Sequence, residues 1–516
     1  MSVAVKSGHY SNSEMKRHTT AGIIVIGDEI LKGSTRDTNS HFICKRLHSR
    51  GIFVKKISVV SDEIQDIANE VRHFSGIFDM VLTTGGIGPT HDDRTFEGLS
   101  QAFHDEMEVN DELRAFVEMF ILKTKMKGVD DTIERFCKIP KSMKLLWGSR
   151  PPEVQNDSDN LIFPSFQIRN VIAFPGVPRY CELTFNLVED HLFPIGANFP
   201  FYSKAIYLNK SEVYLQKELR NIADGYSPAV SIGAYPVISH NYFKTKLIVE
   251  STSHQKGELA HKELVSAFGD NVIHFDETPW LDAPKKLDEF LGRQSQKFQA
   301  KISDALKVID TVLDQYGMGN TSLSFNGGKD CTILLHLFRV CVDRRFGRGT
   351  SLHGFHILHS DEFPDVMQFS REISTKYKLE LRQLNGPIRG GLAQLKVDQP
   401  NVVAVLMGSR FTDPNGRYMN SKCEWTDADW PHLLRVCPVL DWSYSEIWTA
   451  IRGLCIPYCS LYDQGYTSLG EKSKTHPNPA LKISGKENKY RAAYNLQEEH
   501  LERCSRDGSS TNGPTT

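Results

Sequence analysis

The sequence lacks any segment that could cross a membrane. No apolar run reaches the ~18 residues that a membrane-spanning helix needs, and the first twenty residues hold no apolar stretch typical of a secretory signal. A surplus of basic residues is also absent, since 61 Lys and Arg stand against 63 Asp and Glu. The net charge of −2 provides no general attraction for nucleic acid or a membrane surface. We therefore expect neither among the partners.

The ten cysteines lack the spacing of a metal or disulfide site. None form a Cys-x-x-Cys pair, and the nearest two, Cys455 and Cys459, have no matching second pair or histidine cluster for zinc. We expect reduced core thiols, which are typical of a reducing compartment. The expected location is cytoplasmic. A mitochondrial presequence is the alternative, because the first twenty residues hold three basic side chains against one acidic.

The composition is that of a folded protein, with 40% hydrophobic and 24% charged residues. Strand-like apolar runs alternate with helical spacing over 21–26, 39–50, 53–60, 64–74 and 78–84. A similar alternation begins with a strand over 321–325 and includes another over 402–407. Such alternation predicts right-handed βαβ units and mostly parallel sheets.

The region between these two parts has a different pattern. Residues 202–275 are expected to fold as β-α-β-β-α-β, a split-βαβ module, with a helix over 211–223 that Ser211 caps. A single strand is expected over 168–174, and one long amphipathic helix over 283–316.

The predicted fold class is α/β, with two mostly parallel, doubly wound α/β domains joined by the small split-βαβ (α+β) module. The α/β domains are expected at 20–195 and 283–502, the module at 200–280, and disordered tails at 1–19 and 503–516.

The sharpest motif is Ser324-Phe-Asn-Gly-Gly-Lys-Asp-Cys-Thr332, between a predicted strand and a predicted helix. Its glycines allow the backbone to approach a phosphate, and the helix start adds amides and a positive partial charge. Lys329 supplies a mobile cation. A Walker loop would have Ser or Thr directly after this lysine, where the chain has Asp330. A carboxylate would repel a phosphate bound in this loop unless Mg²⁺ lies between the two anions. Asn326 could add a neutral oxygen ligand to that ion.

This motif resembles the PP-loop of the ATP pyrophosphatase superfamily, whose members cleave ATP between the α and β phosphates and release pyrophosphate. In detail it is similar to the loop of eukaryotic FAD synthases. Further stretches share that resemblance, at 407–414, 425–431, 438–442, 457–470 and 478–481. One position departs from it, because the family has two adjacent arginines where this chain has Arg410 and Phe411.

The resemblance implies Mg²⁺-dependent adenylyl transfer from ATP to FMN. The implied ATP-binding residues are Ser324, Phe325, Asn326, Gly327, Gly328, Lys329 and Asp330, with Asn326 and Asp330 on the metal. The implied catalytic residues are Asn326, Lys329, Asp330, Arg410 and Asp413. The implied FMN-binding residues are Gly408, Arg410, Asp413, Asp427, Trp430 and Arg503.

Physical chemistry agrees with several of these roles. The Arg410 guanidinium could grip a phosphate with two hydrogen bonds, and Asp413 could orient it or bind Mg²⁺. Asp427 could bond the edge of the flavin ring, while Trp425 or Trp430 packs on its face. A surface ion pair for Arg410, core packing for the tryptophans and a solvated charge for Arg503 are the alternatives.

A second glycine-rich motif, Thr83-Thr-Gly-Gly-Ile-Gly-Pro-Thr-His-Asp-Asp93, also follows a predicted strand. Loops at the carboxyl ends of parallel strands converge, so acids after the first strand could meet it. The predicted phosphate and metal site consists of Asp28, Glu29, Gly85, Gly86, Gly88, Thr90, Asp92 and Asp93.

This second region, over roughly 20–190, resembles the molybdopterin-binding domain in the variety found in CinA proteins, also at 27–33 and 174–178. The resemblance implies pyrophosphate handling. In animal FAD synthases this domain is associated with metal-dependent FAD hydrolysis. The resemblance does not specify the metal, and a transition metal is one possibility. A domain that only folds and assembles is the alternative.

The combined pattern predicts an FAD synthase whose N-terminal domain is a pyrophosphatase or a regulatory unit. An enzyme of molybdenum-cofactor assembly and a flavin-binding module without catalysis are the alternatives. The expected partners are ATP, FMN and FAD, with client apo-flavoproteins and a homo-oligomer left open.

Overall fold

The computed structural model describes residues 19–124, 130–148, 163–194, 200–237, 240–358, 361–414, 416–485 and 488–506. Of the two predicted tails, 1–18 and 507–516 lie outside these residues. The chain forms two compact units. The first consists of Met1–Ile206, Ser211–Tyr235 and Lys246–Asp270, and the second of Tyr207–Lys210, Pro236–Thr245 and Asn271–Thr516.

The N-terminal sheet has six strands in the order β2-β1-β3-β8-β7-β6. Pairing is parallel from β2 to β8 and antiparallel beyond it. The strands are β1 (Thr20–Ile26), β2 (Phe53–Val60), β3 (Met80–Thr84), β6 (Lys144–Leu146), β7 (Ser165–Ile168) and β8 (Val171–Phe174). A separate ribbon pairs β4 (Met107–Val109) with β5 (Lys138–Pro140).

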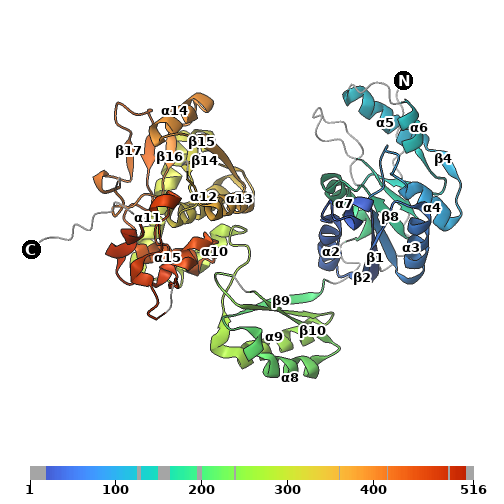
Figure 1. The fold of residues 1–516 in the computed structure, drawn as a ribbon, viewed down its shortest axis with the longest axis horizontal. Coiled ribbons are helices and arrows are strands. Elements are labelled where there is room, and N and C mark those ends of the chain that lie inside the picture. The colour runs from blue at the N-terminus through green and yellow to red at the C-terminus, as the bar shows by residue number, and fades with distance from the viewer. Residues whose placement is uncertain are drawn as a thin grey trace, which may run out of the picture. The chain divides into compact units, whose positions relative to one another are not determined.

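Helices cover both faces of this sheet (Figure 1). α2 (Asn39–Ser49) and α7 (Pro178–Leu192) lie on one face, and α3 (Ile64–Ile77) and α4 (Thr95–Phe103) on the other. Successive residues of β1 enter the two separate apolar cores, Ile23 on the first face and Ile24 on the second. Three further helices are α1 (Asp28–Leu31), α5 (Asp111–Thr124) and α6 (Asp130–Phe136).

The single strand expected over 168–174 was a wrong prediction. β7 and β8 are two antiparallel strands of a hairpin, and Arg169 at the turn has a φ of 50°. Only two polar residues separate the apolar runs, which is why the turn was not visible in the pattern.

The split-βαβ module forms a four-stranded sheet in the order β10-β11-β9-β12. Its elements are β9 (Tyr202–Leu208), α8 (Gln216–Tyr226), β10 (Val230–Pro236), β11 (Thr245–Ser251), α9 (His254–Phe268) and β12 (Val272–Ile273). The helix expected over 211–223 begins later, after a short 3-10 turn at Glu212–Tyr214, and Ser211 makes no side-chain capping bond. Val213 and Tyr214 are exposed, so no buried side chain anchors an earlier helical turn.

The C-terminal sheet has the order β15-β14-β13-β16-β18-β17, and only β17 pairs antiparallel. Its strands are β13 (Thr321–Ser324), β14 (Leu352–Leu358), β15 (Leu379–Asn385), β16 (Ala404–Leu406), β17 (Cys423–Trp425) and β18 (Leu434–Val436). The larger core lies against α10 (Ala283–Leu291), α11 (Gln296–Tyr316), α12 (Lys329–Phe346), α13 (Pro364–Tyr377) and α15 (Tyr444–Gly453). A smaller core contains Leu395 of α14 (Ile388–Asp398). The predicted α/β class, with two doubly wound and mostly parallel sheets, is confirmed.

The long helix expected over 283–316 is broken. α10 ends at Leu291, and α11 starts after Ser295, whose hydroxyl accepts the N–H of Phe298. Gly292 and this capping serine interrupt the helix although the apolar stripe continues in phase across the break.

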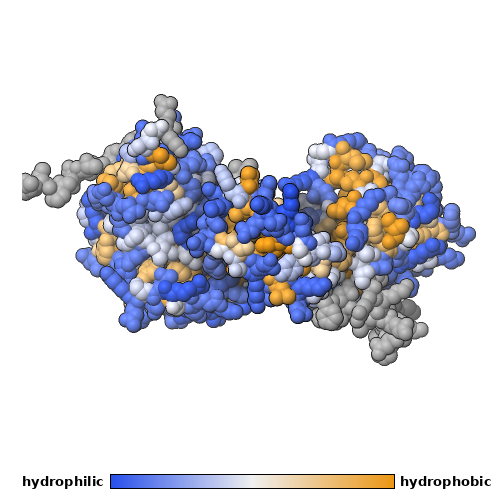
Figure 2. Space-filling view, turned by 90° about the horizontal axis from the view of Figure 1, so that it is seen from below, coloured by the Kyte–Doolittle hydropathy of each residue, from blue (hydrophilic) through white to orange (hydrophobic). Residues whose placement is uncertain are grey.

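Within the described part of the chain, no helix is both long and apolar enough to span a bilayer. On the face shown in Figure 2, apolar residues form separate patches in a mostly hydrophilic surface.

Candidate functional site

The predicted ATP loop and the predicted Arg410 loop meet at a switch point of the C-terminal sheet. β13 lies between β14 and β16. The chain runs from β13 to β14 on one side of the sheet, whereas β16 lies on the other side, and a crevice forms outside the carboxyl ends of β13 and β16 where the strand order reverses. Residues 325–328 follow β13, and residues 407–413 follow β16. A Cβ on Gly408 would lie 2.6 Å from the backbone nitrogen of Cys331, so only glycine permits this approach.

The loop after β13 is shaped by its own side chains. Gly327 has a φ of +72°, which favours glycine. The Asn326 Oδ1 atom accepts the N–H of Gly328 at 3.0 Å and lies 3.0 Å from Cys331 Sγ. Phe325 packs in the core, so only its backbone borders the loop. Asn326 therefore holds the loop in shape, and its place on a metal stays a prediction.

Four charged side chains form a buried cluster beside this loop. Lys329 Nζ lies 3.0 Å from Asp330 Oδ2 and 2.5 Å from Glu502 Oε1. Arg410 places Nε 2.8 Å from Asp330 Oδ1, and its Nη2 donates to both oxygens of Glu502 at 2.5 and 2.6 Å. Arg410 is fully buried, so the surface ion pair considered above was wrong. Two cations and two carboxylates are thus held together in a site largely shielded from solvent.

These contacts favour the charged forms of Asp330 and Lys329. Burial by itself would raise the pKa of Asp330, but the charges of Lys329 and Arg410 outweigh it and hold the pKa below its ordinary value. Burial likewise opposes the charged form of Lys329, yet Asp330 and Glu502 raise its pKa. Two buried cations therefore stand beside the loop, each paired with carboxylates, and an anionic substrate would compete with Glu502 for them.

Asp413 supports the arginines. Its Oδ2 accepts the N–H of Arg410 at 2.8 Å, and its Oδ1 lies 3.4 Å from Arg503 Nη1. Burial and the nearby Asp330 charge raise the pKa of Asp413. These contacts favour the orienting role over direct metal binding.

Sequence reasoning missed Glu502 and ended the domain too early. Arg503 lies in the 3-10 helix Glu499–Ser505, so the predicted tail does not begin at 503. Buried side chains tie this helix down, because Thr467 donates to the carbonyl of Glu502 and Asn478 to that of Leu501. Glu502 stands in an acidic run that resembles a solvated surface, and nothing local distinguished it.

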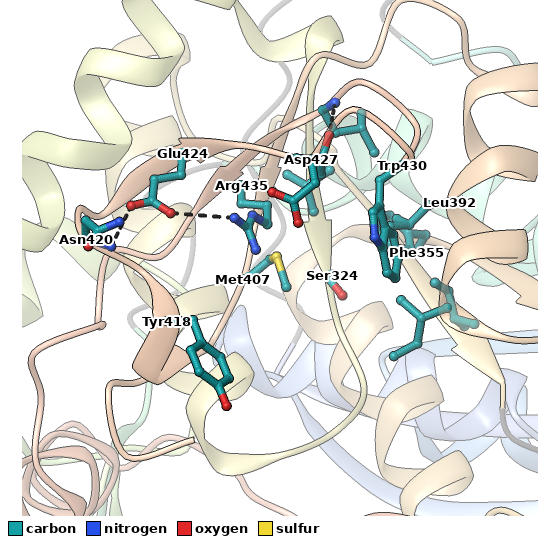
Figure 3. A pocket seen from close by; sticks show the side chains of 15 residues that line it. Ser324, Phe355, Leu392, Met407, Tyr418, Asn420, Glu424, Asp427, Trp430 and Arg435 are labelled. Atoms are coloured by element: carbon teal, nitrogen blue, oxygen red, sulfur yellow. Dashed lines mark hydrogen bonds and ion pairs between the residues drawn. The ribbon is translucent and has the colours of Figure 1, made fainter. Parts of the chain in front are cut away.

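A cavity of about 560 Å³ adjoins the loop, with Ser324 at the end of β13 in its wall. Asp427 and Trp430 of the predicted FMN set line it, and they lie near each other in Figure 3. Trp425 is not among the lining residues and stacks instead on His432, 4.3 Å between ring centroids. The sequence did not predict the other lining side chains, which include Phe355, Ile357, Ile388, Leu392, Met407, Tyr418, Glu424 and Arg435.

Polar side chains fix one side of this cavity. Glu424 accepts the N–H of Asn420 at 2.5 Å and lies 3.5 Å from Arg435, as the dashed lines of Figure 3 show. The remaining wall is largely apolar and aromatic. Such a mixture suits a flat heteroaromatic ring with polar edges.

The N-terminal motif also lies at a switch point, between β1 and β3. Gly85 has a φ of +106°, and a Cβ there would meet the carbonyl oxygen of Ile26 at 1.9 Å, so the loop and the end of β1 are in contact. A Cβ on Gly86 would collide with Thr95, and one on Gly88 with Asp93. A side chain at any of the three predicted glycines would therefore collide with a neighbouring residue.

The predicted acids of this loop are held by local bonds. Thr90 Oγ1 donates to Asp92 at 2.6 Å and to Asp93 at 2.5 Å. Asp28 forms an exposed ion pair with Lys32 at 2.7 Å. The described residues contain no group of three or more His, Cys, Asp or Glu side chains arranged to hold a metal ion.

Asp62 is an acid that sequence reasoning missed. It accepts the N–H of Asp28 at 2.9 Å. Burial raises its pKa, and the charges of Glu29, Asp28 and Asp92 raise it further, so these carboxylates influence one another. Asp62 follows β2, the neighbour of β1, and the convergence of strand ends could have identified it.

Three family models match the chain in order. They are a probable molybdopterin binding domain over residues 22–193, the middle domain of FAD synthase over 200–277, and a phosphoadenosine phosphosulfate reductase domain over 320–390 and 391–477. A Caenorhabditis elegans protein named probable FAD synthase is 42% identical over 517 residues, which cover 96% of this chain and 99% of that protein. The chain belongs to the FAD synthase family. It is therefore a nucleotidyltransferase, and the predicted pairing of the two domain types is confirmed.

Shorter proteins match part of the chain. A probable FAD synthase of Schizosaccharomyces pombe is 35% identical over 219 residues, covering 41% of this chain and 80% of that protein. The crystal structure of Candida glabrata FMN adenylyltransferase with FAD and inorganic pyrophosphate has a TM-score of 0.41 and 25% identity, covering 44% of this chain and 96% of that one.

Proposed function

We propose that the C-terminal unit transfers the adenylyl group of ATP to FMN, forming FAD and releasing pyrophosphate. The observation that carries this proposal is the buried pair of Lys329 and Arg410 at the switch point, beside a cavity lined by Asp427 and Trp430. A relative aligned over nearly the whole chain favours it over the two alternatives, cofactor assembly and flavin binding without catalysis.

The reaction needs positioning and charge neutralisation. A phosphate oxygen of FMN attacks the α-phosphorus of ATP, the bond from that phosphorus to the bridging oxygen breaks, and pyrophosphate departs with the electron pair. Lys329 and Arg410 would face the phosphates, while the glycine amides cradle them. No covalent intermediate with the protein is required.

The donor set fits Mg²⁺ carried by the nucleotide. Mg²⁺ in such sites usually takes one or two carboxylates and completes its shell with substrate phosphates and water. Asp330 is the carboxylate that borders the loop; its Oδ1 already pairs with Arg410 Nε at 2.8 Å, so the ion would compete with that contact. When bound there, Mg²⁺ would neutralise part of the charge on the phosphates.

FMN would place its ring in the cavity and its phosphate toward the loop. Asp427 would accept a hydrogen bond from the ring edge, and Trp430 would pack against the ring. Gly408 would let the chain pass close to the phosphates, and Arg503, beside Asp413, would add a further cation.

The full chain with ATP, FMN and Mg²⁺ provides the test, with FAD and pyrophosphate both measured. Asp330→Asn should abolish turnover, while FMN should still bind, as measured by the quenching of its fluorescence. Asp314→Asn is the matched control, because Asp314 is exposed and pairs with Arg345 at the surface of α11. Absence of both products from the wild type, or full turnover by Asp330→Asn, would refute the assignment.

We propose a second activity for the N-terminal unit, the metal-dependent hydrolysis of FAD to FMN and AMP. Water would add to one phosphorus of the pyrophosphate and the other phosphate would leave. The glycine-rich loop beside Asp28, Glu29, Asp62 and Asp92 supports it. These acids do not form a metal site by themselves, but one or two of them could bind a divalent ion, including a transition metal, whose remaining ligands would be the substrate phosphates.

The test is FAD hydrolysis without ATP, in Mg²⁺, Mn²⁺ and Co²⁺. Asp62→Asn and Asp92→Asn should lower it and leave FAD synthesis unchanged, whereas the exposed Asp190→Asn should change neither. Absence of hydrolysis under all three metals would favour a unit that only folds and assembles. Delivery to client apo-flavoproteins, a homo-oligomer and a cytoplasmic location stay predictions.

A further inference from the structure

A loop of the middle module belongs to the same compact unit as the ATP site. Residues 236–245, between β10 and β11, group with 271–516 rather than with the rest of their module. We call 240–245 the strap. In the strap, Tyr242 Oη lies 3.1 Å from the carbonyl oxygen of Ile451 and 2.7 Å from that of Ile456, to which it donates. The first carbonyl belongs to the last turn of α15, and the second lies three residues beyond its end.

Arg452 joins the strap to the residues after α15. Its Nη1 donates to the carbonyl of Asn241 at 2.7 Å and to Tyr458 Oη at 3.0 Å. The guanidinium also lies 4.1 Å from the ring centre of Tyr242 and 4.5 Å from that of Tyr494. A planar cation held between two rings and two hydrogen-bond acceptors has one defined orientation.

The contacts continue from Tyr458 to the ATP loop. Tyr458 Oη donates to Asp463 at 3.1 Å, which ties it to the 3-10 helix Ser460–Gln464. The ring of Trp448 packs edge-on against both Tyr458 and Tyr462. Tyr462 is buried, and its Oη accepts the backbone N–H of Lys329 at 2.8 Å. This hydrogen bond fixes the first residue of α12, where the phosphate cradle ends.

We propose that the strap is a positioning element for the nucleotide site, acting through Arg452, Tyr458 and Tyr462 on the backbone of Lys329. The middle module thereby contributes to the C-terminal reaction without touching a substrate. Only the identity of the nucleotide rests on the proposed function. The cavity lined by Asp427 and Trp430 contains no residue of this path, so flavin binding should be independent of the strap.

The test uses the full chain and binding measurements, so that it does not depend on turnover. Tyr242→Phe removes the hydroxyl and keeps the ring, and it should weaken binding of a non-hydrolysable ATP analogue by roughly five-fold, the loss expected for one hydrogen bond, while FMN affinity is unchanged. Tyr214→Phe is the matched control, because Tyr214 belongs to the same module and is 83% exposed. Arg452→Lys keeps the charge but loses the planar fork, and it provides a second variant with the same expectation.

A double-mutant cycle distinguishes a path from general packing. If the strap acts through Tyr462, the effects of Tyr242→Phe and Tyr462→Phe on analogue binding should be non-additive. Additive effects, unchanged analogue binding, or an equal loss of FMN affinity would overturn the proposal. If the analogue data agree but the wild type forms no FAD, the proposed function fails and the positioning role stands.

Discussion

Glu502 offers the sharpest test of how the C-terminal site binds anions. Its carboxylate contacts Lys329 and Arg410, the two cations that would face phosphate. In this cluster two positive charges meet the two negative charges of Asp330 and Glu502, so the charges cancel. Glu502→Gln keeps the shape and removes one negative charge. The variant cluster therefore carries one unpaired positive charge.

This change should have opposite effects on the free and the bound protein. A unit charge about 5 Å from a phosphate contributes about 3 kcal/mol at an effective dielectric constant of about 20. Solvent and the remaining amide will reduce this, and we expect pyrophosphate to bind about 1.4 kcal/mol more tightly, which is ten-fold. The free protein should lose stability, because removing one partner of a buried ion pair leaves charge uncompensated. A loss of about 2 kcal/mol would lower the melting temperature by about 4–8 °C in a unit of this size.

The assay is titration calorimetry with inorganic pyrophosphate, together with melting curves with and without it. Glu499→Gln is the matched control. Glu499 lies in the same 3-10 helix, but its carboxylate accepts the N–H groups of Tyr444 and Ser445 at the start of α15. The control should melt earlier without binding pyrophosphate more tightly.

The combination of lower stability and tighter binding is specific to competition between Glu502 and phosphate. If Glu502→Gln binds pyrophosphate equally or more weakly, Glu502 does not compete with the phosphates. It would then serve to hold Lys329 and Arg410 in their binding positions.

Three further predictions address single positions. Gly408→Ala should lower FAD formation more than ten-fold, because its Cβ would meet backbone atoms at 2.6 Å; near-normal rates would mean that the two loops separate in the bound state. Phe411→Arg should lower the KM for a phosphate substrate, since Phe411 is 46% exposed beside Arg410, and an unchanged value would assign it to packing. Burial raises the pKa of Asp463 from 3.8 to about 6, so its proton stabilises the fold below about pH 4 and this contribution is lost as the pH rises through 6. Relative to Asp463→Asn, the melting temperature of the wild type should fall between pH 4 and 7, and parallel curves would contradict the expected titration.

The sequence predicted the elements where local pattern decides them. Buried strands such as 21–26 and 321–325 are apolar runs bounded by turn residues, and they need no tertiary information. Breaks were harder to predict. The apolar positions Phe290 and Phe298 stay in helical phase across residues 292–295, so the pattern continues where the helix does not.

The site divides in the same way. The glycine-rich loops were predictable because a strand, glycines and a helix start lie together in the chain. Glu502 and Tyr462 reach Lys329 from 173 and 133 residues away, and only tertiary packing brings them there. Asp62 is an intermediate case. It follows a strand adjacent to β1, and the convergence of strand ends in a parallel sheet would have predicted its position.

The two switch points differ in the charge that surrounds the glycines, and this difference should appear in their need for metal. The C-terminal loop has Lys329 and Arg410 buried against it, and a phosphate can compete with Glu502 for both. Around the N-terminal loop, Asp28, Asp62, Asp92 and Asp93 are acidic, and Lys32 is already paired with Asp28. Pyrophosphate should therefore bind the C-terminal unit measurably in EDTA, whereas an N-terminal site would need a divalent ion to attract the same anion. In the Lys329→Met variant, pyrophosphate binding that persists in EDTA and vanishes with Asp62→Asn would contradict this reasoning.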